Sequence, residues 1–208
     1  AVATTKAFST QLIAVYALAI EFAKVKELID EVKYNELLNE IKNIPDKITD
    51  ILNNLTTNIQ KIASKFSNIK DAFYIGRGLD YAISLEGSLK LKEVSYIHSE
   101  AYASGELKHG TISLIEDKTL VIGIATQEEI FEKTISNLVE VKSRGAYVVV
   151  VTSEGKDVSK VANDTIYIPT TNKYFYPSLS VIPLQLIGYY ITVSKGLDVE
   201  VIKISHWT

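Results

Sequence analysis

Hydrophobic residues change their spacing along the chain near residue 70. Up to residue 68 they recur every three or four positions, as in FSTQLIAVYALAIEFAKVKELIDEV, which is the spacing of an amphipathic helix. No glycine precedes Gly76, which favours helices joined by short connections. Pro45 and Asp46 predict the start of a further helix, because proline suits the first turn of a helix. We therefore expect residues 4–68 to be helical.

Four short apolar runs rich in β-branched residues follow. They are DAFYIG (71–76), TLVIGIA (119–125), AYVVVVT (146–152) and DTIYIP (164–169). Helical patterns lie between and after them, at about residues 81–94, 128–145, 157–163 and 178–196. Apolar strands that alternate with helices indicate a parallel sheet buried on both faces. The predicted fold class is α/β, with a three-layer α/β/α domain preceded by a helical N-terminal segment.

Composition narrows the class of protein. The chain has 208 residues, of which 47% are hydrophobic, enough for one domain with a substantial core. A net charge of −3 argues against a general nucleic-acid binder, which needs a basic surplus to neutralise phosphates. We see no run of 18 apolar residues and no basic-then-apolar leader. We therefore expect neither a membrane span nor a signal peptide, and we favour a cytoplasmic protein.

Two residue types are missing altogether. Without cysteine, the chain has no disulfide, no thiolate metal site and no cysteine nucleophile of its own. It also lacks methionine and begins at Ala1, so we expect a processed or excised piece.

A glycine-containing turn follows the first predicted strand. In an open parallel sheet, ligands bind beyond the carboxyl ends of the strands, and Gly76-Arg77-Gly78 lies at such an end. The turn is only loosely similar to a dinucleotide-binding fingerprint, because Tyr81 stands where the third glycine is needed. We interpret it as a tight connection between strand and helix, and we expect no cofactor.

Residues 85–110, LEGSLKLKEVSYIHSEAYASGELKHG, carry the charges of greatest interest. On a helix, Glu86, Lys90 and Glu93 fall within about 60° of one another. The apolar stripe beside them consists of Ala82, Leu85 and Leu89. This stripe predicts that the charges lie at the margin of the buried face. Two interpretations stay open: ion pairs worth about 0.2–0.5 kcal/mol each, or a carboxylate base beside an ammonium that stabilises developing negative charge.

Two histidines lie in the same stretch. His98 stands among Tyr96, Ile97 and Tyr102, an apolar setting that favours a hydrogen-bonded structural histidine. His109 stands in the polar run GELKHG, where a histidine that titrates near neutrality suits catalysis. No HxH or HExxH spacing occurs, so we predict no metal site.

Three segments resemble one known family. GRGLDYAISLEGSLKLKEVSYIHSEAYASGELKHGTISLIE looks like the isomerase portion of the glucosamine-6-phosphate synthases, the glutamine:fructose-6-phosphate aminotransferases. VATTKAFSTQL (2–12) is similar to the segment that closes the first sugar-isomerase (SIS) domain of that family, and VIPLQLIGYYITVSKGLDV (181–199) to the last helix of the second. The resemblance implies a second SIS domain with a flavodoxin-like sheet over residues 70–208, and the end of the first over residues 1–69.

The resemblance also implies a reaction and roles for individual residues. The family converts fructose 6-phosphate and ammonia, drawn from glutamine, into glucosamine 6-phosphate. Glu93 matches the base that moves a proton between C1 and C2, and Lys90 matches the lysine beside it. His109 matches the ring-opening histidine, which in the family reaches the site of the adjacent subunit and so implies a homodimer. The positions that match substrate-binding residues are Glu86, on the same helix, and Val2 and Thr4, near the sugar phosphate.

Two features of the family are missing from this sequence. No SxSGxT phosphate-binding run occurs, so we expect the chain alone to bind sugar phosphate poorly. The tail DVEVIKISHWT lacks the family's PRNLA run, and the imine-forming role of the family's tail lysine is not assigned to Lys203. Two further hypotheses stay open: a non-catalytic SIS module that binds sugar phosphates, and a related sugar-phosphate isomerase or deaminase.

Overall fold

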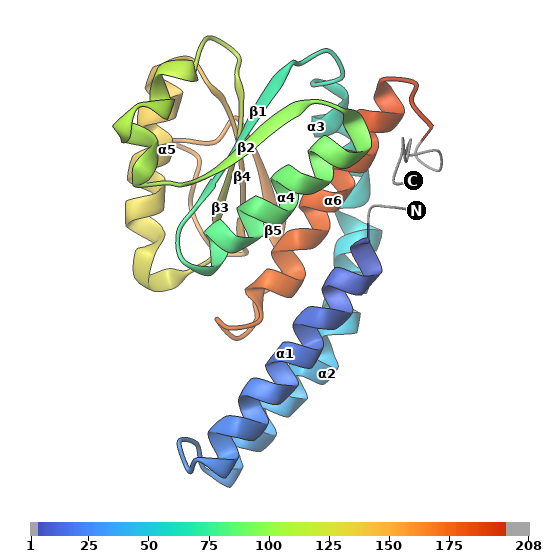
Figure 1. Cartoon of the computed structure of the whole chain (residues 1–208), viewed down its shortest axis with the longest axis vertical. Helices are drawn as coiled ribbons and strands as arrows, with labels where there is room; N and C mark the ends of the chain where they lie inside the picture. Colours follow the sequence, from blue (N-terminus) through green and yellow to red (C-terminus); the bar gives the residue numbers. More distant parts are fainter. Residues whose placement is uncertain (1–3, 199–208) are drawn as a thin grey trace, which may run out of the picture.

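A parallel five-stranded sheet forms the centre of the molecule. The computed structural model describes residues 4–198, and its sheet has the strand order β2-β1-β3-β4-β5 (Figure 1). The strands are β1 (Asp71–Gly76), β2 (His98–Ala103), β3 (Leu120–Ala125), β4 (Tyr147–Ser153) and β5 (Asp164–Ile168). This is the flavodoxin-like order, in which the winding of the chain reverses between β1 and β3. The expected α/β class and parallel sheet are confirmed.

Helices cover both faces of this sheet. They are α1 (Thr5–Val25), α2 (Glu31–Asn54), α3 (Thr56–Ser64), α4 (Leu79–Ser95), α5 (Phe131–Ser143) and α6 (Tyr176–Ser194), with short 3₁₀ turns η1 (Glu106–His109), η2 (Thr111–Leu114) and η3 (Glu128–Ile130). Successive strand residues point to opposite faces, so Tyr74 belongs to the core on the side of α2, α3, α4 and α6, whereas Phe73 and Ile75 belong to the core on the side of α5. The result is the predicted three-layer α/β/α architecture.

Strand β2 is the element that hydrophobic patterning did not predict. It pairs with β1 from Asp71 opposite His98 to Gly76 opposite Ala103. It lies at one end of the sheet and is only partly buried, so it lacks the continuous apolar run of the inner strands. Tyr96, whose φ of 59° is left-handed, ends α4 and allows the chain to turn back into this strand.

Two helix predictions need correction. No helix starts at Pro45, because α2 runs through this proline and the next helix begins only at Thr56. Ile44 and Ile51 of α2 are buried in the core, and this packing stabilises a helix that proline alone would interrupt. The predicted short helix at 157–163 is a series of turns, since so short a segment gains too few hydrogen bonds to offset the cost of helix nucleation.

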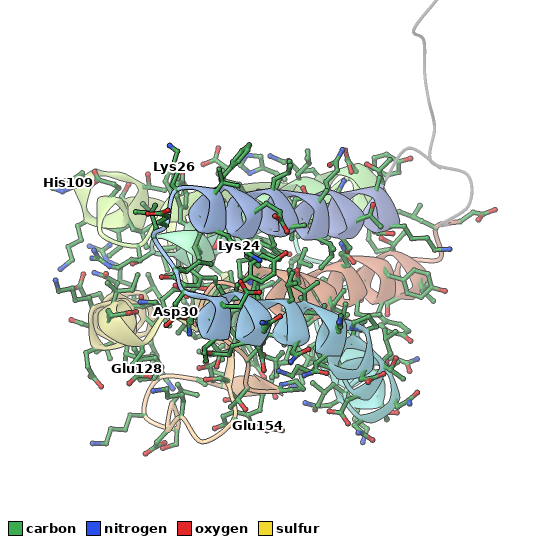
Figure 2. The ribbon with its side chains drawn as sticks, turned by 90° about the horizontal axis from the view of Figure 1, so that it is seen from below. Lys24, Lys26, Asp30, His109, Glu128 and Glu154 are labelled. Atoms are coloured by element: carbon green, nitrogen blue, oxygen red, sulfur yellow. The ribbon has the colours of Figure 1, made fainter. Side chains whose placement is uncertain are left out.

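Helices α1 and α2 form a long hairpin that projects from the α/β layers (Figure 1). Their connection carries Lys26 and Asp30, which lie at the tip of the hairpin in Figure 2. Within residues 4–198, α1 is also the one helix long and apolar enough to cross a membrane by length and composition. That is weak support for a membrane span, because core helices and signal sequences meet the same criterion.

Candidate functional site

Lys90 lies between two carboxylates on the last turns of α4. Its Nζ is 2.5 Å from Oε2 of Glu93 and 3.6 Å from Oε1 of Glu86. The Lys90 side chain is 6% exposed, Glu86 11% and Glu93 26%. One buried ammonium is thus shared by a carboxylate that is largely buried and by a carboxylate that reaches solvent. The three residues are called the α4 charge cluster below.

Helix geometry and close packing together position the α4 charge cluster. The spacings i,i+3 and i,i+4 place the three side chains on one face, as the sequence predicted. The predicted apolar stripe is wrong, because Ala82, Leu85 and Leu89 are all exposed. The buried positions of α4 include Ile83, Ser84, Gly87, Ser88 and Leu91. Small side chains predominate there because α4 is pressed between β1 and α6.

Gly87 shows how close that packing is. A Cβ atom on Gly87 would lie 2.6 Å from Cδ1 of Leu184 in α6 and 2.9 Å from Cε1 of Tyr74 in β1. Both distances are shorter than carbon–carbon contacts allow. Only glycine lets α4 lie this close to its neighbours, and the adjacent Glu86 is consequently drawn inward.

Burial changes the acidity of Glu86. Removal from water raises the pKa of its carboxyl, and the negative charge of Glu93 raises it further, whereas Lys90 lowers it. Oε1 of Glu86 is buried and, among the described residues, accepts no hydrogen bond. The cluster therefore contains a carboxylate that is poorly solvated beside one that is accessible, which is an arrangement suited to proton transfer.

The C-terminal end of α4 is held by α6. Lys195, just after α6, donates a hydrogen bond of 2.7 Å from Nζ to the backbone oxygen of Ser95. A cation at this point satisfies a free carbonyl and complements the negative end of the helix dipole. Lys195 is not among the residues that the sequence predicted, where its signal is a basic residue at the end of the last helix.

His109 lies far from the α4 charge cluster in the same chain. Helix α4 leaves the carboxyl end of β1 and returns to the amino end of β2, so its last turns lie at the amino edge of the sheet. His109 follows β2 and lies at the opposite, carboxyl edge, exposed at the border of the molecule (Figure 2). Glu93 follows Leu79 by fourteen positions along α4, a rise of about 21 Å at 1.5 Å per residue. The structure brings Glu86, Lys90 and Glu93 together and places His109 apart.

The N-terminal candidates are described only in part. Val2 lies outside the described residues, and Thr4 is an exposed residue whose backbone oxygen accepts the N–H of Phe8 at the start of α1. The first turns of α1 line a cavity of about 470 Å³ together with α2 and Ile182, Gln185 and Leu186 of α6. The last turns of α4 pack on the same helix at Gly188. Helix α6 therefore connects the start of α1 with the α4 charge cluster.

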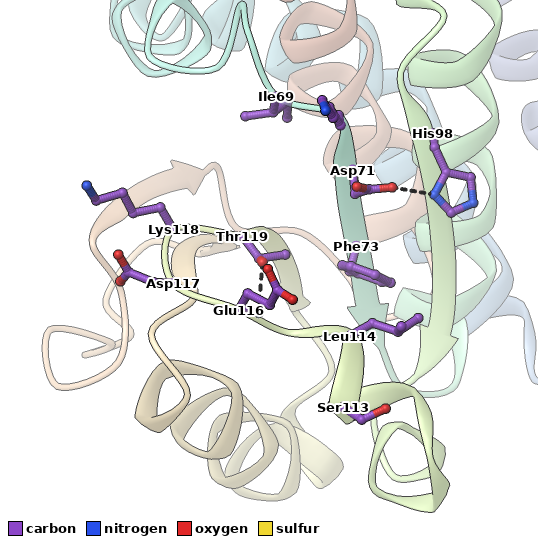
Figure 3. A pocket seen from close by; sticks show the side chains of 11 residues that line it. Ile69, Asp71, Phe73, His98, Ser113, Leu114, Glu116, Asp117, Lys118 and Thr119 are labelled. Atoms are coloured by element: carbon purple, nitrogen blue, oxygen red, sulfur yellow. Dashed lines mark hydrogen bonds and ion pairs between the residues drawn. The ribbon is translucent and has the colours of Figure 1, made fainter.

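His98 is hydrogen-bonded, as predicted, but its surroundings are not apolar. Its Nδ1 is 2.8 Å from Oδ1 of Asp71, its Nε2 is 3.3 Å from Oε1 of Glu100, and 55% of its side chain is exposed. It lines a cavity of about 470 Å³ at the amino ends of β1, β2 and β3 (Figure 3). None of the residues predicted to act on substrate lines this cavity.

Sequence comparison relates the chain to one domain family. The model of the SIS domain family matches residues 65–195. Glutamine–fructose-6-phosphate aminotransferases (isomerizing) are 54% identical to the chain in Caldanaerobacter subterraneus and 55% identical in Clostridium tetani, each over 96% of this chain. The chain spans about a third of the length of these relatives, 33% in both cases.

Solved structures agree with that relationship. The C-terminal domain of a glucosamine-fructose-6-phosphate aminotransferase from Francisella tularensis is 36% identical and superposes with a TM-score of 0.88, covering 94% of this chain and 55% of that one. A glucosamine-6-phosphate deaminase from Thermotoga maritima is 25% identical, with a TM-score of 0.66, covering 93% of this chain and 53% of that one.

Proposed function

Because the chain belongs to the SIS domain family, we propose that it is the sugar-phosphate isomerase part of a glutamine:fructose-6-phosphate aminotransferase. The reaction would convert fructose 6-phosphate and ammonia into glucosamine 6-phosphate. The observation that carries the proposal is the α4 charge cluster, in which a buried Lys90 is shared by Glu86 and Glu93.

The α4 charge cluster suits aldose–ketose isomerisation. This reaction needs one carboxylate above two adjacent carbons and a positive charge near their oxygens, because negative charge develops on the enediol-like intermediate. Glu93 is the more exposed carboxylate and serves as the base that moves the proton between C1 and C2. Lys90, beside it, stabilises the oxygen. Glu86 holds Lys90 from the buried side and contributes to substrate binding, with Val2 and Thr4 near the phosphate.

The position of His109 supports a homodimer with shared sites. Within one chain, His109 and Glu93 lie at opposite edges of the sheet, too far apart for one sugar. His109 of one subunit therefore opens the sugar ring in the site that contains Glu93 of the other. Residues 1–69 belong to the end of a first SIS domain and residues 70–208 form the second, and the enzyme is cytoplasmic.

A chimeric enzyme tests the proposal. The corresponding third of the Caldanaerobacter subterraneus aminotransferase is replaced by residues 1–208, and formation of glucosamine 6-phosphate is measured. We expect the chimera to be active and Glu93→Gln to lower its kcat by about 10²–10⁴-fold, the usual contribution of a general base. The isolated chain should bind fructose 6-phosphate weakly, since it has no SxSGxT run.

Glu36→Gln is the matched control, because Glu36 forms an i,i+3 pair with Lys33 on the exposed surface of α2. It should leave kcat unchanged. A folded but inactive chimera, or a Glu93→Gln chimera within about threefold of its parent, would contradict the proposed role.

A sugar-phosphate deaminase is the second candidate, favoured by the similarity to the Thermotoga maritima deaminase. The two reactions run in opposite directions. Ammonia release from glucosamine 6-phosphate without glutamine-dependent synthesis, measured in the complete protein, would favour the deaminase.

A further inference from the structure

Asp80 fills the position where ligands bind in this type of sheet. That position is the crevice at the carboxyl ends of β1 and β3, where the winding of the sheet reverses. The Asp80 side chain enters it from the first turn of α4 and is 2% exposed. Oδ2 accepts the N–H of Thr126 at 2.8 Å and the N–H of Gln127 at 3.3 Å, and Oδ1 accepts the Thr126 hydroxyl at 2.5 Å.

Neutral donors surround this carboxylate. Among the described residues, no lysine or arginine forms an ion pair with Asp80. Two backbone N–H groups, a hydroxyl and the N-terminal end of α4 stabilise it instead. Burial raises the pKa of Asp80, whereas these hydrogen bonds lower it. The same set of donors binds phosphate and other oxyanions when the anion comes from a ligand.

The preceding turn is shaped to bring Asp80 to this place. A Cβ on Gly76 would lie 2.6 Å from the backbone of Asp80, and Gly78 has a φ of 55°, in the left-handed region. The N–H of Asp80 donates to the oxygen of Arg77 at 3.0 Å and closes the turn. A tight turn with glycine at two positions therefore holds the carboxylate against the turn after β3.

We propose that Asp80 is an internal anion that closes this crevice to oxyanion ligands. Its carboxylate occupies the site that the N–H groups of Thr126 and Gln127 offer to an oxyanion. A last step rests on the proposed function. The phosphate of the sugar is held on the side of the α4 charge cluster, away from the carboxyl edge of this sheet.

The proposal is tested by removing the Asp80 carboxylate and supplying a small anion from solution. Asp80→Ala removes the carboxylate and leaves a space that formate fits. We measure thermal unfolding of the 208-residue chain in chloride, formate and inorganic phosphate at equal ionic strength. Relative to chloride, formate at ten times its dissociation constant should raise the midpoint of Asp80→Ala by about 3–6 °C and leave the wild type unchanged. In NMR spectra, the amide signals of Thr126 and Gln127 should shift only in Asp80→Ala.

Asp80→Asn is the volume-matched control, since its amide fills the space and formate should not stabilise it. Asp46→Ala, at an exposed position of α2, controls for general charge removal. Equal responses to formate in Asp80→Ala, Asp80→Asn and the wild type would overturn the proposal. An Asp80→Ala variant that stays unfolded in formate would also overturn the proposal. An Asp80→Ala variant that folds only when formate is present would support the proposal.

The measurements in inorganic phosphate test whether Asp80 excludes the phosphate of the sugar. Stabilisation of Asp80→Ala by phosphate as well as formate would support exclusion of phosphoryl groups by Asp80. Stabilisation by formate alone would overturn the exclusion of phosphoryl groups by Asp80, because the crevice would then be too small for phosphate. None of these measurements depends on activity, so they succeed or fail separately from the proposed function.

Discussion

Lys90 illustrates what residue spacing predicts and what it does not. That Glu86, Lys90 and Glu93 share a face follows from helix geometry and is confirmed. How deeply they are buried depends on the elements that pack against α4, and spacing contains no such information. The expected stripe at Leu85 and Leu89 failed for this reason, because the buried face is built from small residues. The catalytic interpretation came from family resemblance and not from spacing.

The raised pKa of Glu86 makes stability depend on pH. Its pKa in the folded chain lies above the ordinary 4.5, so the folded state retains this proton more strongly than the unfolded state does. The stability that Glu86 contributes is therefore complete below pH 4.5 and is lost as pH rises through the raised pKa. Glu86→Gln does not titrate. We expect urea unfolding to show the variant gaining stability relative to the wild type as pH rises from 4 to 8.

Exposed Glu36 again provides the control, and Glu36→Gln should show no such pH-dependent gain. A Glu86→Gln variant whose relative stability stays constant, or falls, across this pH range would show that burial does not raise the pKa.

At the scale of elements, four strands were predictable and one edge strand was not. Strands β1, β3, β4 and β5, the last of which forms the other edge of the sheet, each lie within one residue of their predicted bounds at either end, because each contains apolar residues that pack in the core. Strand β2 is half-exposed, and its polar residues form no apolar run, so the sequence predicted no strand there. The passage of α2 through Pro45 was equally hidden, since it depends on packing by residues distant in sequence.

Gly87 and Gly188 offer a paired test of the α4–α6 contact. Alanine normally stabilises a helix interior by about 0.5–1 kcal/mol relative to glycine. A Cβ on Gly188 has its nearest neighbour at 3.5 Å, so Gly188→Ala should gain stability of this size. A Cβ on Gly87 would overlap Leu184 and Tyr74, so Gly87→Ala should lose about 1–3 kcal/mol. Urea unfolding measures both, and a stabilised Gly87→Ala would refute the close contact.

For the whole molecule, the sheet separates His109 from Glu93, which the sequence could not reveal. Their spacing of sixteen residues gives no hint that a strand reverses the chain between them. The proposed shared sites lead to a complementation test in the chimeric enzyme. His109→Asn and Glu93→Gln homodimers should each be nearly inactive.

Random mixing of the two variants makes about half of the dimers heterodimers, and each heterodimer has one intact site of two. About a quarter of all sites are then intact, so we expect about a quarter of wild-type activity. We measure glucosamine 6-phosphate formation after the variants are unfolded together and refolded. Activity that stays at the level of the separate variants would show that His109 and Glu93 do not meet across subunits.

The position of β2 at one end of the sheet has a consequence for association between chains. An edge strand has free backbone N–H and C=O groups that another strand could pair with, which makes it a template for aggregation. In β2, His98, Glu100 and Tyr102 follow one another along one face. The Tyr102 hydroxyl donates a hydrogen bond to the Glu100 carboxylate, and Nε2 of His98 lies 3.3 Å from Oε1 of Glu100. A strand from another molecule docking there would have to desolvate this charged row. The polar residues that disguised β2 in the sequence thus protect the open side of the sheet.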